Sequence, residues 1–161
     1  MRRWEFIAAL EQAPKRLSAG TSGLNAAQLK QRPGSGEWSV IELVCHLRDY
    51  AEIFDSRIAS ALSEDSPEVA SYDNEDMVAS REYESQDLAT VLAAHRAIRE
   101  RMLAKLATLT EAQWQRTVRH ATWGQPTLEW LMNRCAEHEL EHLADIEAVR
   151  RELGQGTPGL R

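Results

Sequence analysis

Apolar side chains recur at helical spacing along most of the chain, and the alternation typical of strands is nearly absent. Four long segments carry this pattern, at residues 4–17, 39–62, 85–109 and 127–153. Each has one narrow apolar face, which a helix buries most readily against other helices. The pattern therefore predicts an all-α fold, a four-helix bundle. Shorter helical segments near 25–31, 77–81 and 110–114 fall in the connections, where they could close one end of the bundle over a pocket.

Local signals set the expected ends of these helices. Ser39 and Glu42 form a capping box at the start of the second long segment. In the first segment we assign Trp4 to the buried face, and we expect Pro14 to kink or interrupt the helix. Gly154 is typical of a residue just past a helix end. We therefore expect one domain over residues 1–153 and a flexible tail over 154–161.

Composition excludes several classes of function. The chain has 161 residues, which suits a single domain, and its net charge of −6 comes with no basic patch, so a nucleic-acid partner is not expected. No apolar run approaches the roughly 20 residues that span a bilayer, and the N-terminus lacks the apolar core of a signal peptide. We therefore expect a cytoplasmic protein with no membrane partner. In a reducing compartment its two cysteines, Cys45 and Cys135, would be free thiols.

His138 and His142 lie one helical turn apart, a spacing that lets two imidazoles hold one metal ion. With Glu139 between them they match the H-E-x-x-H pattern of zinc metalloproteases. A protease also needs a third protein ligand and a sheet edge to hold an extended peptide. The 19 residues after His142 contain no histidine, and strand signals are missing. The protease interpretation is therefore rejected.

The helix faces on which the histidines lie are more informative than the protease pattern. His138 and His142 share the apolar face of their helix, and His46 shares the apolar face of the second segment. Buried imidazoles need a hydrogen bond or a metal to offset their desolvation. Three such histidines can form a catalytic zinc site with one open coordination position. From the residues alone, a metal site and hydrogen-bonded core histidines both remain open.

Two longer runs carry a family resemblance. Residues 32–47 read Arg-Pro-Gly-Ser-Gly-Glu-Trp-Ser-Val-Ile-Glu-Leu-Val-Cys-His-Leu, and residues 138–146 read His-Glu-Leu-Glu-His-Leu-Ala-Asp-Ile. With Tyr72-Asp73, Leu109-Thr110 and Trp114, and His120 with Gly124 and Thr127-Leu128, they resemble the DinB-like superfamily of damage-inducible and YfiT-type metal-dependent enzymes. The match covers essentially the whole chain.

The resemblance implies an up-down-down-up bundle, often homodimeric, that binds a divalent metal such as zinc or nickel. His46, His138 and His142 fall on the family's three ligand positions. Some relatives use a low-molecular-weight thiol such as bacillithiol or mycothiol. A thiol-dependent S-transferase acting on small electrophilic substrates, or a small-substrate hydrolase, is therefore expected. A non-catalytic metal- or ligand-binding stress-response protein is the alternative, and a purely helical interaction module is a third possibility.

Several side chains could support such a site. Glu139 is a weak candidate for a general base, because it lies about 100° around the helix from His138; a supporting or surface role fits better. Trp38, Tyr50 and His95 are candidates to line the pocket. Asp145 or Glu141 could orient a ligand histidine through its second ring nitrogen, although solvated charges are commoner.

Overall fold

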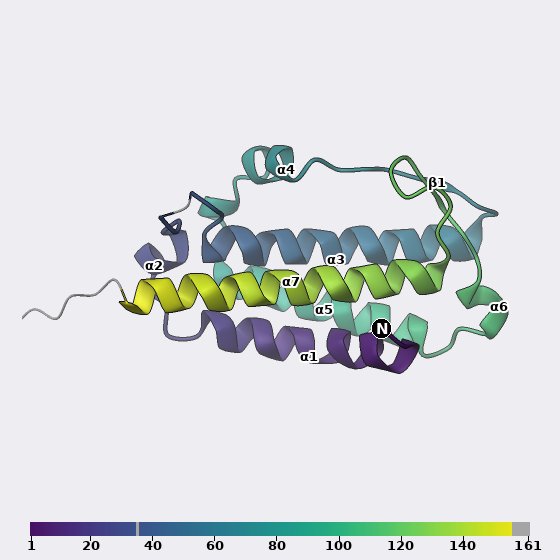
Figure 1. Ribbon diagram of the computed structural model, residues 1–161, viewed down its shortest axis with the longest axis horizontal. Coiled ribbons are helices and arrows are strands. Elements are labelled where there is room, and N and C mark those ends of the chain that lie inside the picture. The colour runs from purple at the N-terminus through teal and green to yellow at the C-terminus, as the bar shows by residue number, and fades with distance from the viewer. Residues whose placement is uncertain (35, 156–161) are drawn as a thin grey trace, which may run out of the picture.

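The computed structural model describes residues 1–34 and 36–155, and helices dominate it (Figure 1). Four long helices form the body of the molecule: α1 (Arg3–Thr21), α3 (Val40–Ser63), α5 (Leu88–Leu106) and α7 (Leu128–Gln155). The connections carry the short elements α2 (Ala26–Lys30), β1 (Glu68–Val69), α4 (Asn74–Ser80), a 3₁₀ turn η1 (Tyr83–Ser85), α6 (Glu111–Trp114) and β2 (Arg119–His120). None of the helices in these residues is long and apolar enough to cross a membrane.

The four long helices form an up-down-down-up bundle, as predicted. In Figure 1, α1 and α7 run in one direction while α3 and α5 run in the other. Helices α3 and α5 are therefore parallel neighbours, and the chain between them must return along the length of the bundle. Residues 64–87 make this return and carry β1, α4 and η1 over one face. In Figure 1 this crossover runs along α3, which both α4 and η1 contact.

Side-chain caps explain where several helices begin. Ser39 accepts a hydrogen bond from the Glu42 amide, and the Glu42 carboxylate accepts one from the Ser39 amide, so the predicted capping box is confirmed. Thr110 and Gln113 cap α6 in the same way. Helix α5 begins at Leu88 under an Asp87 cap, three residues later than the expected start at Ser85.

The first helix differs from expectation in two ways. It continues from Arg3 through Pro14 to Thr21, so the proline does not interrupt it. Trp4 is 62% exposed, and Phe6 is the aromatic residue that faces the core. Trp4 was assigned to the wrong face of the helix, because near a helix terminus few apolar positions define which face is buried.

Among the residues that the structure describes, the strands form one short parallel pair, in which β1 lies beside β2. The pair joins the crossover to the loop before α7. Helix α7 continues through Gly154 to Gln155, two residues past the expected end at Leu153. Most of the tail expected over 154–161 lies outside the described residues.

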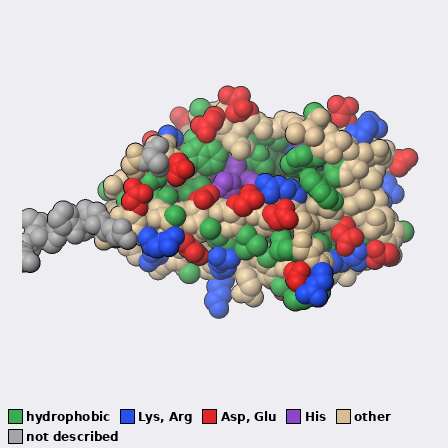
Figure 2. All heavy atoms as spheres, in the orientation of Figure 1, with side chains coloured by type: hydrophobic (Ala, Val, Ile, Leu, Met, Phe, Trp, Pro, Cys, Tyr) green, Lys and Arg blue, Asp and Glu red, His purple; other side chains and the backbone are tan. Residues whose placement is uncertain are grey.

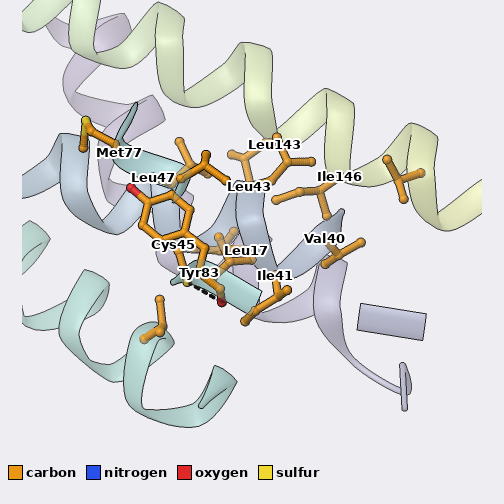
Figure 3. Close-up of a cluster of buried hydrophobic side chains, with 14 of the residues drawn as sticks. Leu17, Val40, Ile41, Leu43, Cys45, Leu47, Met77, Tyr83, Leu143 and Ile146 are labelled. Atoms are coloured by element: carbon orange, nitrogen blue, oxygen red, sulfur yellow. Dashed lines mark hydrogen bonds between the residues drawn. The ribbon is translucent and has the colours of Figure 1, made fainter. Parts of the chain in front are cut away.

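Two apolar clusters fill the bundle, one toward each end. Figure 3 shows the first, in which Leu43 and Leu47 of α3 meet Leu143 and Ile146 of α7. The second gathers around Phe54 and the N-terminal half of α7 as far as Ala136. Along α7 the polar residues 138, 139 and 142 therefore fall between the two clusters. This gap is where the bundle can hold a polar site.

Candidate metal centre

The bundle brings His46, His138 and His142 together. His46 comes from the first third of α3, and the other two stand one turn apart on α7. One ring nitrogen from each lies within 4.8 Å of the others, and His46 Nε2 is 3.1 Å from His138 Nε2. The structure thus assembles all three histidines that the resemblance placed on ligand positions.

The geometry and protonation of this cluster suit one divalent ion. Two imidazole nitrogens that bind one tetrahedral zinc, each about 2.0–2.1 Å from it, lie about 3.3 Å apart. The separation between His46 Nε2 and His138 Nε2 is close to this value. Burial, reinforced by the charge of a neighbouring histidine, lowers the pKa of His46 to about 3 and that of His138 to about 2. Both rings are therefore neutral at pH 7, with a lone pair available for a metal. The residues present fit such an ion.

His142 is held in place by a carboxylate. Its Nδ1 lies 2.9 Å from Asp145 Oδ2, an arrangement in which Nδ1–H donates and Nε2 is left to bind a metal. This is the role considered for Asp145 or Glu141; Glu141 pairs instead with Arg134. His46 Nδ1 is buried without a partner, so His46 lacks an equivalent support among the described residues.

Aromatic rings pack around the histidines. The Trp38 ring centre is 4.8 Å from that of His46 and 6.2 Å from that of His142. Tyr50 stacks on His138 with ring centres 4.4 Å apart. Trp38 also lines a cavity beside the cluster, whereas Tyr50 does not line it. These two candidates for pocket lining therefore both contact the cluster.

A cavity of about 490 Å³ opens beside His142, whose side chain is 19% exposed. Figure 2 shows histidine side chains at the bottom of a hollow on this face. Its acidic lining residues already have partners. Asp145 bonds His142, Glu75 accepts a hydrogen bond from Trp38 Nε1 and Glu152 accepts one from the Gly34 amide. The cluster is therefore open to a small molecule on the side of His142.

Glu139 points away from this cavity. It is 2% exposed and accepts hydrogen bonds from His95 Nε2 at 2.9 Å and from Arg99 Nη2 at 2.6 Å. Burial raises the pKa of Glu139, but the Arg99 charge and the His95 bond more than offset this and hold it below its ordinary value. Glu139 is therefore an ion-paired carboxylate in the core, and the surface alternative is wrong.

His95 does not line the cavity, because it is fully buried against Glu139. Sequence reasoning missed Arg99, which completes this buried group. The sequence did contain a signal for the burial of Arg99, because Arg99 follows His95 by one helical turn on the apolar face of α5. Cys135 lies 3.5 Å from Arg99 Nη1, and burial raises the pKa of its thiol, so it is not a ready metal ligand.

Comparison with known proteins decides the family. The family model described as the DinB superfamily matches residues 9–146. The chain belongs to the DinB superfamily.

Two relatives align with this chain over most of their own length. A Geobacillus kaustophilus protein is 29% identical over 151 residues, covering 93% of this chain and 85% of its own. YfiT from Bacillus subtilis is 27% identical over 151 residues, with the same coverage. Both are named for an inferred metal-dependent hydrolase activity.

Solved structures agree with the fold. The structure of Bacillus subtilis YfiT, described as having an unusual four-helix bundle topology, superposes with a TM-score of 0.89 at 27% identity, covering 95% of this chain and 88% of that one. A mycothiol-dependent maleylpyruvate isomerase matches with a TM-score of 0.70 at 14% identity, covering 91% of this chain and 61% of the isomerase. The second similarity is one of fold alone.

Proposed function

We propose that this chain is a metal-dependent enzyme that transfers a low-molecular-weight thiol to small electrophilic substrates. The observation that carries the proposal is the cluster of His46, His138 and His142 at the edge of a cavity of about 490 Å³. Three imidazole ligands would leave the fourth position of a tetrahedral ion free, and the cavity beside His142 would give a small molecule access to it.

Zinc and nickel both suit an imidazole site, and we expect one of them. A divalent ion bound there would supply Lewis-acid chemistry, lowering the pKa of a thiol or of water. The protein's own residues would orient the ligands and exclude water. Asp145 fixes the ring of His142, and Trp38 and Tyr50 provide apolar walls on two sides of the cluster.

The position of Glu139 favours thiol transfer over hydrolysis. Hydrolysis usually needs a general base within hydrogen-bond reach of the attacking water. Glu139 is committed to Arg99 and His95 in the core. A thiol with a lowered pKa ionises without a dedicated base, since the thiolate itself is the nucleophile. Thiol transfer therefore demands less of the residues around this cluster.

A small-substrate hydrolase is the second candidate, supported by the activity inferred for YfiT and the Geobacillus relative. Asp145, with an exposed carboxylate on the cavity wall, is the residue that could assist water in that case. A metal- or ligand-binding stress protein without turnover is the non-enzymatic alternative. Turnover measurements separate all three.

Metal analysis of protein purified without a histidine tag tests the centre itself. We expect close to one zinc or nickel per chain and at least a tenfold loss of affinity in His142→Ala. His120→Gln is the matched control, because His120 stacks on Trp123 outside the cluster. Metal-free protein in every preparation, or equal loss in both variants, would refute the centre.

Turnover tests the reaction. The metal-loaded protein is incubated with a thiol and a chloro-arene or an epoxide, and with esters or amides in place of the electrophile. Thioether formation that a chelator abolishes supports the transferase. Chelator-sensitive hydrolysis without thioether formation supports the hydrolase, and stoichiometric metal with neither activity supports the binding protein.

The expected homodimer and the cytoplasmic location stay predictions. Analytical ultracentrifugation of the metal-loaded protein measures the first, and cell fractionation measures the second.

A further inference from the structure

The cavity beside His142 is lined by more negative than positive side chains. Figure 2 shows acidic side chains around the hollow at whose bottom the histidines lie. Among the described residues that line the cavity, one is cationic, Arg32, and four carry carboxylates: Glu37, Glu75, Asp145 and Glu152. A cavity lined by an excess of one sign of charge attracts ligands of the opposite sign.

Arg32 does not balance these carboxylates, because it is engaged with Glu42. The Nε and Nη2 groups of Arg32 both donate to the Glu42 carboxylate. Glu42 is 1% exposed, so losing its partner would leave a buried charge unpaired. The one cationic side chain of the described lining is therefore held by a carboxylate that does not line the cavity.

Glu75 and Glu152 receive hydrogen bonds from uncharged groups. Glu75 Oε1 accepts from Trp38 Nε1 at 3.1 Å, and Glu152 Oε1 accepts from the Gly34 amide at 2.9 Å. Neither carboxylate forms an ion pair with a lysine or arginine in the part of the chain that the structure describes. Because a carboxylate can accept about four hydrogen bonds, both can still bind a charged donor.

The two carboxylates lie at different depths from the metal centre. Glu75, at the start of α4, is joined to it through Trp38, whose ring centre lies 6.2 Å from that of His142. Glu152 follows His142 by ten residues, which is about 15 Å along α7. A ligand with one end at the histidine cluster therefore meets these carboxylates farther along its length.

The rest of the lining suits the organic part of such a ligand. The Trp38 ring lines the same cavity, and an aromatic face attracts an organic cation. Apolar side chains complete the lining, namely those of Pro33, Leu43, Ala148 and Val149. A hydrated inorganic cation would gain nothing from this apolar surface, whereas a hydrocarbon chain with a positive group would bury against it.

We propose that this cavity binds the alkylammonium group of a small molecule through Glu75, Glu152 and the Trp38 ring. Resting on the proposed function, this molecule is one of the two reactants, the thiol or the electrophile, and its reactive end lies at the histidine cluster. The inference gives the site a charge preference: a reactant with an ammonium group binds better than its neutral or acidic analogue.

Nuclear magnetic resonance of the Trp38 Nε1–H group tests the contact, because this group is bonded to Glu75. Trp38→Phe identifies its signal. Chelator-treated protein is titrated at constant ionic strength with hexylammonium chloride, 1-hexanol and sodium hexanoate, so the test is independent of the metal centre. We expect a saturable shift with hexylammonium at a concentration at least threefold lower than with hexanol, and the weakest response with hexanoate. Added salt should reduce this preference.

Substitutions supply the controls. Glu75→Gln and Glu152→Gln each keep an oxygen that can accept the existing hydrogen bond but remove the charge. Each should weaken hexylammonium binding about two- to fivefold, as expected for exposed charges, and leave hexanol binding unchanged. Glu147→Gln is the matched control, since Glu147 lies on the same helix but pairs with Arg16.

Two results would overturn the proposal: equal binding of hexylammonium and hexanol by the wild-type protein, or hexylammonium binding that the double variant Glu75→Gln, Glu152→Gln leaves unchanged. If a variant fails to fold, the wild-type comparison still decides.

Kinetics then identify which reactant carries the ammonium group. Cysteamine and N-acetylcysteamine are compared as thiols with a neutral chloro-arene, and chloro-arenes with and without an aminomethyl group are compared with N-acetylcysteamine. The cationic reactant whose KM rises in the double variant is the source, and a KM unchanged for both cations would count against the proposal. Metal content should stay the same in this variant. Absence of all turnover would refute the proposed function, while the metal-free titration would still test the ammonium site.

Discussion

Replacing Arg99 with methionine should strongly destabilise the protein. Arg99 is 1% exposed, and its Nη2 holds Glu139 at 2.6 Å in a core from which water is excluded. Removing one partner of a buried pair leaves the other charge uncompensated, which costs about 3–5 kcal/mol. For a domain of this size each kcal/mol lowers Tm by about 2–4 °C, so the melting temperature should fall by about 6–20 °C.

Replacing Glu139, alone and together with Arg99, gives a sharper test of the buried ion pair. Glu139→Leu alone should cost a similar 3–5 kcal/mol, because it leaves the Arg99 cation buried. The double variant Arg99→Met, Glu139→Leu retains neither charge and mainly deprives His95 of its acceptor, at about 1–3 kcal/mol. The double variant should therefore be more stable than either single variant.

Urea unfolding of chelator-treated proteins, followed by circular dichroism, measures these free energies without the stabilisation that a bound metal adds. Two results would refute the reasoning: a loss below about 1 kcal/mol for Arg99→Met, or a double variant as unstable as the two single losses combined. The first would mean that water reaches the pair. The second would mean that Arg99 and Glu139 act through packing rather than through their charges.

Three further predictions concern single residues outside the cluster. Ser39→Ala removes the cap of α3 and should lower the free energy of unfolding by about 0.5–2 kcal/mol in urea, while Ser18→Ala on the exposed face of α1 should change little. Pro14→Ala should raise that free energy by about 1–2 kcal/mol, because alanine restores an amide donor inside α1 and this gain exceeds the added freedom of the unfolded chain; a lower Tm would contradict this. Burial and the bond to Asp49 raise the pKa of Tyr83, so its stabilising effect is full below about pH 10, the unfolded value, and is lost as pH rises beyond it. Absorbance at 295 nm should show a late ionisation step that occurs only as the protein unfolds, and Tyr83→Phe should remove that step; a late step unchanged in this variant would contradict the burial.

Most of the secondary structure could be read from the sequence because its causes are local. The capping boxes at Ser39 and Thr110 involve groups three residues apart. The residues that predict the start of each helix are therefore the ones that cap it. The pairing of His138 with His142 is likewise fixed by helical spacing alone. The misplaced Trp4 shows the limit, since which face of a helix is buried depends on its neighbours.

The chain by itself thus determined four amphipathic helices, their caps and a histidine pair, each through interactions within one or two helical turns. Only the tertiary structure decided that α3 lies against α7, so that His46 completes the cluster across 92 residues of sequence. It also decided that Glu139 turns inward to Arg99 and that no carboxylate of the described residues pairs with the buried Arg57. These outcomes depend on how whole helices pack and on which charges that packing cuts off from water, and no local pattern encodes either.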